Sequence, residues 1–82
     1  MLKVSVISPE AVLFEGETDS VIAPAYDGEV GILTGHAPLM ALLGEGVLRL
    51  GTGPARKFNV NGGFIQVIEN QVRVVTEKAT PA

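Results

Sequence analysis

The residues of this 82-residue chain that could do chemistry gather in one short segment, GEVGILTGHAPLM, residues 28–40. The segment contains the single histidine of the sequence, His36, with Thr34 two residues before it and Glu29 upstream. A hydroxyl nucleophile needs an adjacent base and a third group that orients that base, and no nucleophile elbow or triad spacing surrounds this histidine. Asp27 and Glu29 could serve as an acid–base pair, but their spacing is equally typical of a solvated strand face. We therefore predict no catalytic residue.

Metal and cofactor sites find equally little support. One histidine and no cysteine cannot fill a zinc shell without several carboxylates. The segment GEGVLRLGTGPAR has paired glycines, but it lacks a GK[ST] ending and a following helix, so these glycines are interpreted as turn residues. Carrier domains for lipoyl or biotinyl groups are also small β-sandwiches with a lysine at a hairpin tip, whereas Lys57 lies inside a strand pattern. A β-sandwich carrier or ligand-binding module remains an alternative, and a small hydrolase that uses His36 is a weaker one.

Composition favours a protein-binding domain. The hydrophobic fraction is 46% before the ten glycines are counted, which is high for a small soluble domain. Some apolar side chains must therefore lie on the surface, where an apolar patch usually marks a protein-binding face. The net charge is −3 and the six basic residues are mostly scattered, so no nucleic-acid partner is expected. The start MLKVSVISPE alternates rather than forming a signal peptide, and no apolar run approaches the ~20 residues of a membrane span.

Hydrophobic periodicity predicts an all-β fold. Apolar and polar residues alternate over short segments separated by turn signals, one of them at Gly51–Pro54. The predicted strands are 2–7, 11–14, 19–23, 29–32, 40–43, 46–50, 56–60, 63–68 and 71–76. No segment of ten or more residues shows a helical stripe. Many short strands with close turns indicate a small antiparallel sandwich or barrel, and the length allows one domain, residues 1–82.

Several turns carry specific expectations. Glu69–Asn70 is predicted to be the tip of a hairpin. The glycine pair in VNGGF is either a hairpin turn or a bend where a strand changes sheets. The ending KATPA is interpreted as a frayed end or the start of a linker. Gly31 and Gly35 allow the histidine-bearing segment a tight path, so alanine at either position is expected to lower stability.

The string GEVGILTGHAPLM followed by GEGVLRL resembles the epsilon subunit of F-type ATP synthases. That family carries G-(E/Q)-x-G-(I/V)-(L/Y)-x-(G/N)-H-A-P at this distance from the N-terminus. The segments VSVISPEAVLFEGE and VNGGFIQVIENQVRVVTEKA match the family's further strands in order, so the resemblance covers all 82 residues. It implies a flattened β-sandwich of about ten short strands, without catalytic activity or cofactor. It also implies a rotor subunit of the central stalk that couples proton translocation to ATP synthesis.

The same resemblance implies partner residues. Glu29 and His36 fall where the family touches the polar loops of the membrane c-subunit ring, and Ser8 and the segment Met40-Ala41-Leu42 fall where it packs on the gamma subunit. The family usually continues into two C-terminal helices, which are absent from this sequence, so regulation by those helices is not assigned to it. As part of the ATP synthase, the protein is expected to be peripheral to the bacterial inner membrane, on its cytoplasmic face.

Overall fold

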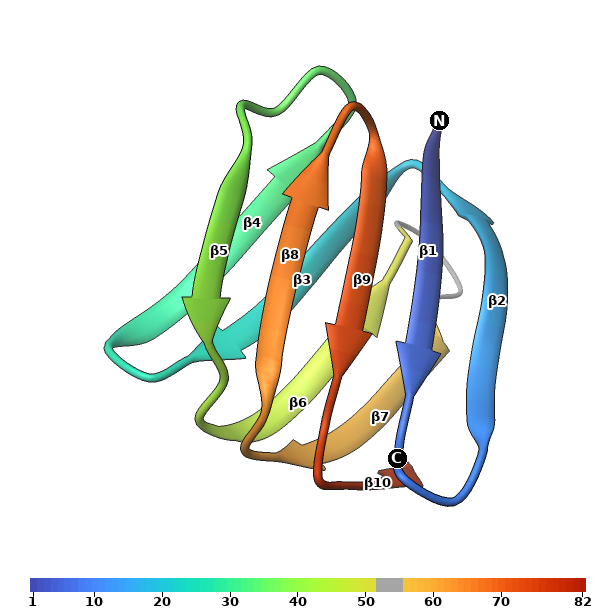
Figure 1. Ribbon diagram of the computed structural model, residues 1–82, viewed down its shortest axis with the longest axis vertical. Helices are drawn as coiled ribbons and strands as arrows, with labels where there is room; N and C mark the ends of the chain where they lie inside the picture. The colour runs from blue at the N-terminus through green and yellow to red at the C-terminus, as the bar shows by residue number, and fades with distance from the viewer. Residues whose placement is uncertain (52–55) are drawn as a thin grey trace.

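The computed structural model describes residues 1–51 and 56–82, which form ten β-strands and no helix (Figure 1). The strands are β1 (Leu2–Ile7), β2 (Val12–Thr18), β3 (Ser20–Ala25), β4 (Gly28–Leu33), β5 (Leu39–Leu42), β6 (Glu45–Leu50), β7 (Arg56–Asn61), β8 (Phe64–Ile68), β9 (Gln71–Val75) and β10 (Lys78–Pro81). Each of the nine predicted segments overlaps one of the strands β1 to β9. The turn predicted at Gly51–Pro54 lies largely outside the described residues.

The strands form two five-stranded sheets that lie face to face (Figure 1). Sheet A has the order β2-β1-β9-β8-β5, and sheet B has the order β10-β7-β6-β3-β4. Neighbouring strands are antiparallel, except that β1 pairs in parallel with β9. The prediction of an all-β antiparallel sandwich is therefore confirmed, with one parallel pair added.

The core lies between the two sheets and is built by alternation along the strands. In β1, Leu2, Val4 and Val6 are buried while the residues between them point outward. The other buried apolar residues come from both sheets: Val21, Ala23, Ile32, Leu43, Leu48, Leu50, Phe58, Val60, Ile65, Val67, Val72 and Val74. Each sheet therefore turns one face to the core and leaves its other face for solvent or a partner.

The ending KATPA is strand β10 rather than a frayed end. Lys78–Pro81 pairs antiparallel with β7, and Ala79 packs against the core. The buried Thr76 hydroxyl donates to the backbone carbonyl of Lys78 at 3.0 Å, which fixes the turn into this strand. The sequence-based expectation was wrong because the strand is stabilised by pairing with a distant segment, not by its own composition.

The glycine pair Gly62–Gly63 marks the point where the chain changes sheets, from β7 in sheet B to β8 in sheet A. Both residues have positive φ, 73° and 98°, a region that favours glycine. Of the two interpretations of VNGGF, the bend between sheets is therefore confirmed. The hairpin at Glu69–Asn70 is also confirmed, since this turn joins β8 to β9 and both residues have positive φ, 49° and 63°, as in a type I′ turn.

Candidate docking surface

The segment at residues 28–40 places its acidic residue and its histidine at two separate positions of the fold. Glu29 lies near the start of β4, beside the β3–β4 hairpin, whereas His36 lies in the loop beyond the other end of that strand. The strand rise alone separates Glu29 from Leu33 by ~13 Å. The two predicted ring contacts therefore lie near opposite ends of β4 and do not share one loop.

The His36 side chain is turned toward its own loop. Its Nδ1 atom lies 2.7 Å from the backbone carbonyl oxygen of Ala37. Because a carbonyl oxygen can only accept, Nδ1 is the donor of this hydrogen bond. Gly35 next to it has φ 85°, so its expected sensitivity to alanine has a physical basis. Gly31 lies in β4 outside the positive-φ region, and a Cβ added there would meet no atom within 4 Å. The reason for expecting a loss of stability at Gly31 is therefore removed.

The described residues assemble no metal centre. No group of three or more His, Asp or Glu side chains in residues 1–51 and 56–82 could hold a metal ion. Lys57, the candidate carrier lysine, lies within β7 and not at a hairpin tip. In the same part of the chain, no helix is long and apolar enough to cross a membrane.

A row of apolar side chains crosses the outer face of sheet A from one edge to the other. The strand register aligns one outward-pointing apolar residue from each of the five strands. We call this set the apolar row: Val12 of β2, Ile7 of β1, Val75 of β9, Phe64 of β8 and Leu42 of β5. Four strand spacings give it a length of ~19 Å. Its ends are the most open, with Val12 59% and Leu42 66% exposed.

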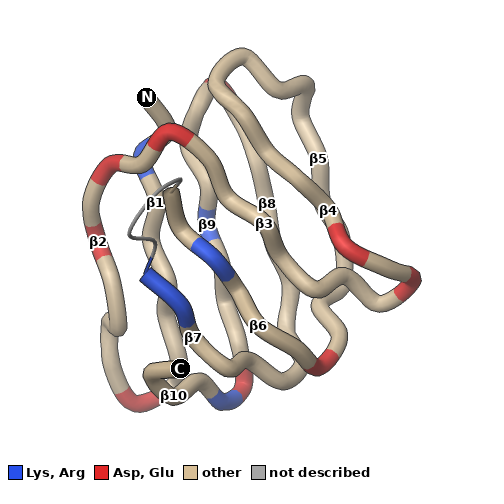
Figure 2. Tube along the Cα trace, turned by 180° about the vertical axis from the view of Figure 1, so that it is seen from behind, with Lys and Arg blue, Asp and Glu red and all other residues tan. Residues whose placement is uncertain are grey.

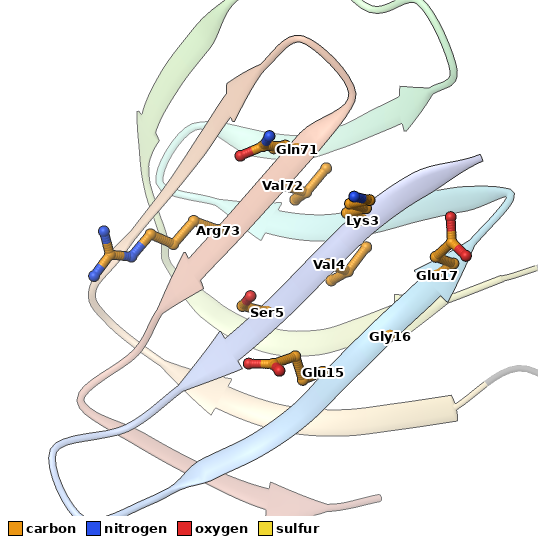
Figure 3. A pocket seen from close by; sticks show the side chains of 9 residues that line it. All are labelled: Lys3, Val4, Ser5, Glu15, Gly16, Glu17, Gln71, Val72 and Arg73. Atoms are coloured by element: carbon orange, nitrogen blue, oxygen red, sulfur yellow. The ribbon is translucent and has the colours of Figure 1, made fainter.

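Polar residues border the apolar row on the same face. The next register line holds Glu15, Ser5, Arg73, Gln66 and the exposed Met40, and the line beyond it holds Glu17, Lys3, Gln71 and Ile68. A shallow groove of about 520 Å³ runs over β2, β1 and β9 between these charged side chains (Figure 3). In Figure 3, Glu15 lies beside Ser5, while Arg73 extends away from β1. An apolar strip beside separated charges of both signs has the anatomy of a protein interface.

The two ends of the apolar row lie near residues that the family resemblance implies for the gamma contact. Met40 and Leu42 are 65% and 66% exposed on β5, at one edge of sheet A. Ser8 follows Ile7 at the other edge, in the β1–β2 turn, where its amide donates to the carbonyl of Ala11 at 2.9 Å. Ala41 is the exception, because it points inward and packs against the core. Its side chain therefore does not face a partner on this surface.

Sequence reasoning missed most of the apolar row, although a signal for it was present. Each member stands beside a second apolar residue, so that the alternation breaks there. The doublets are Val6-Ile7, Val12-Leu13, Leu42-Leu43, Phe64-Ile65 and Val74-Val75. In each doublet one residue packs in or against the core and the other points outward. Only the strand register reveals that the five outward residues lie in one line.

The outer face of sheet B differs in character. Arg49 of β6 lies directly opposite Lys57 of β7, and Figure 2 shows basic residues on both of these strands. Arg56 instead reaches the ring of Phe14 in sheet A, 5.5 Å from its centroid, a cation–π contact between the sheets. The large apolar row thus belongs to sheet A, and sheet B has a more polar exterior.

Comparison with known proteins identifies the domain. The family described as ATP synthase, Delta/Epsilon chain, beta-sandwich domain matches residues 1–82. The chain belongs to this family. It is 48% identical over 77 residues to the ATP synthase epsilon chain of Leptospira interrogans, covering 93% of this chain and 61% of that protein. It is 43% identical over 76 residues to the ATP synthase epsilon chain of Syntrophomonas wolfei, covering 90% of this chain and 56% of that protein. The chain therefore spans about three-fifths of the length of such relatives.

Solved structures support the same fold. The sandwich is similar to a chain in the Euglena gracilis mitochondrial ATP synthase OSCP/F1/c-ring structure, with TM-score 0.90, 23% identity, and coverage of 98% of this chain and 52% of that one. A chain of the Tetrahymena thermophila mitochondrial ATP synthase central stalk/c-ring gives TM-score 0.79 at 16% identity, covering 96% and 65%. At these identities the likeness concerns the fold alone. The fold and family membership predicted from the sequence are confirmed.

Proposed function

We propose that this domain is a non-catalytic part of the central stalk of an F-type ATP synthase, linking the gamma subunit to the c-subunit ring and coupling proton translocation to ATP synthesis. The family match over residues 1–82 and the ATP synthase epsilon chains among the relatives support this proposal. As part of that complex, the protein is peripheral to the bacterial inner membrane on its cytoplasmic face.

The observation that carries the proposal is the apolar row on sheet A. It forms a ~19 Å strip that is open at both edges and bordered by Glu15 and Arg73. Transmission of torque requires a rigid body that is held firmly by its neighbours, and a two-layer sandwich with one apolar outer face fits that requirement. We assign this face to the gamma subunit, with Met40, Leu42 and the turn at Ser8 included in the contact.

The ring contact is proposed along the edge of sheet B. Glu29 and His36 lie at opposite ends of β4, which is an edge strand of that sheet. A flat partner therefore reaches both residues only when β4 lies along it, rather than when one loop points at it. Strand β5, the edge of sheet A, lies on the same side of the sandwich (Figure 1). The gamma and ring surfaces then meet at the β4–β5 edge, so that the domain contacts both partners from adjoining surfaces.

The experiment is a binding titration of the purified 82-residue chain with the gamma subunit of the same organism, together with an assay for ATP hydrolysis. We expect a one-to-one complex and no hydrolysis. Absence of binding at micromolar concentrations contradicts the stalk proposal. ATP turnover that disappears in His36→Ala supports the hydrolase alternative instead.

A further inference from the structure

Asn70 connects three segments at one end of the sandwich. It is the second residue of the β8–β9 turn, with φ 63°. Its backbone carbonyl accepts a hydrogen bond from the amide of Lys3 in β1 at 2.8 Å. Its side-chain Oδ1 accepts a hydrogen bond from the amide of Gly35 at 2.6 Å. The loop at residues 34–38 and the tip of the β8–β9 hairpin lie beside each other at this end (Figure 1).

The loop at residues 34–38 has little else to hold it in place. Thr34, Gly35, Ala37 and Pro38 are exposed, and His36 is half-buried. Within residues 1–51 and 56–82, the other hydrogen bonds of the loop are local, from the His36 amide to the Leu33 carbonyl at 3.0 Å and from the His36 ring to the carbonyl of Ala37. The bond to Asn70 ties the loop to a part of the chain 35 residues away. The conformation of an exposed loop with few packing contacts depends strongly on such a bond.

We infer that Asn70 is a positioning residue: its side-chain carbonyl accepts the hydrogen bond of the Gly35 amide, and thereby holds the His36 loop in the conformation that docks on the c-subunit ring. This inference rests on the proposed function, because it takes the loop to be part of the docking surface. A loop that must be ordered upon binding loses affinity to the entropy of ordering, whereas a loop that is already held does not. The Asn70 bond therefore contributes to affinity without any contact between Asn70 and the partner.

The backbone at Asn70 makes a clean test available. Its positive φ is one that glycine adopts freely and that alanine does not. Asn70→Gly therefore removes the Oδ1 acceptor without straining the turn, and Asn70→Asp keeps an acceptor in the same position. Glu69→Gly is the matched control, because Glu69 lies in the same turn, also has positive φ (49°) and is exposed.

The experiment measures two quantities at a temperature well below the melting transition. The first is the hydrogen-exchange rate of the Gly35 amide, followed by NMR. The second is the affinity of each variant for the purified gamma–c-ring subcomplex in detergent. We expect Asn70→Gly to raise the Gly35 exchange rate at least about tenfold and to weaken binding by about three- to tenfold, the usual range for one lost hydrogen bond. We expect Asn70→Asp to have the Gly35 exchange rate and the affinity of the unaltered chain. We expect Glu69→Gly to leave the Gly35 exchange rate unchanged.

The outcomes separate the inference from the proposed function. An unchanged Gly35 exchange rate in Asn70→Gly overturns the inference, since the bond would then not hold the loop. A faster exchange rate with unchanged affinity also overturns it, because the loop would be held without consequence for docking. Failure of the unaltered chain to bind the subcomplex is a failure of the proposed function, and the positioning role falls with it.

Discussion

Leu42 and Phe64 lie directly opposite each other on β5 and β8, on the outer face of sheet A. Phe64 is half-buried, whereas Leu42 keeps 66% of its surface exposed at the edge of the sheet. Cross-strand apolar pairs stabilise a sheet, but an exposed leucine at an edge leaves much of its surface unused by the fold. A partner that covers this pair therefore buries more apolar surface per residue than it does at the centre of the apolar row.

The first prediction concerns Leu42→Glu. We expect this change to weaken binding to the gamma subunit by about ten- to a hundredfold, which corresponds to the ~1.5–3 kcal/mol of a buried leucine side chain. The β-type circular dichroism spectrum should not change, because the side chain lies outside the core. The matched control is Leu33→Glu, since Leu33 is 63% exposed on an edge strand of the other sheet. Equal loss of gamma affinity in both variants contradicts a contact specific to sheet A.

The second prediction tests whether the partner covers the whole apolar row. Val12 lies at the far edge of sheet A and is 59% exposed. We expect Val12→Ser to weaken gamma binding by about three- to tenfold, while Val47→Ser on the outer face of sheet B has no effect. Because Val12 and Leu42 are ~19 Å apart, their effects on the binding free energy should add. An effect at Leu42 without one at Val12 restricts the contact to the β5 edge.

The third prediction uses the two glycines where the chain changes sheets. A Cβ on Gly63 would collide with the backbone carbonyl oxygen of Val75, and its φ is 98°. We expect Gly63→Ala to lower the free energy of unfolding by about 3 kcal/mol or more. Gly62 has φ 73° but would meet only the flexible side chain of Glu77, so Gly62→Ala should cost about 1 kcal/mol. Urea denaturation of both variants measures the difference, and equal losses contradict the steric argument.

How much of this molecule the sequence predicts depends on how local each signal is. The alternation in residues 2–7 predicts β1 correctly, because one face of that strand is buried and the other is not. Strand β10 was missed, since Lys78, Ala79 and Pro81 have weak strand propensity and the segment is held by its pairing with β7. The role of the glycine pair Gly62–Gly63 could not be decided from the sequence, because a hairpin turn and a change of sheet use the same types of residue.

The docking surface depends even more on non-local structure. The doublet Val74-Val75 indicates an irregular strand, but only the parallel pairing of β1 with β9 aligns Val75 with Ile7. No pattern within either segment specifies that pairing. The separation of Glu29 from His36 is the opposite case. The sequence already predicted a strand at 29–32 between them, and a strand of that length necessarily carries its two ends apart.

The fourth prediction compares two glycines of the histidine-bearing segment. Gly35 has φ 85°, so Gly35→Ala should lower the free energy of unfolding by about 1 kcal/mol. Gly31 lies within β4 and a Cβ there has no neighbour within 4 Å. Glycine destabilises the interior of a strand relative to alanine, because it loses more conformational entropy on folding. Gly31→Ala should therefore leave the free energy of unfolding unchanged or raise it by about 0.5 kcal/mol. Chemical denaturation distinguishes the two cases, and a destabilised Gly31→Ala variant contradicts the open space seen there.

The last prediction addresses Glu29 and His36. Both side chains lie at the surface, Glu29 exposed and His36 half-buried with a bond only to its own loop. Substitutions of exposed polar residues usually change the free energy of unfolding by less than ~0.5 kcal/mol. The melting temperatures of Glu29→Ala and His36→Ala should therefore lie close to that of the unaltered protein. In an ATP synthase reconstituted with this chain, each change should lower proton-driven ATP synthesis.

The separation of these two residues makes the double variant informative. Groups more than 7–10 Å apart without shared partners act additively, so the double variant should show the product of the two single losses of coupling. A loss equal to that of one single variant means that only one end of β4 reaches the ring, and the contact is then end-on. A large drop in melting temperature for His36→Ala instead makes His36 a residue that stabilises its loop. No loss of coupling in any of the three variants excludes the β4 edge as the ring contact.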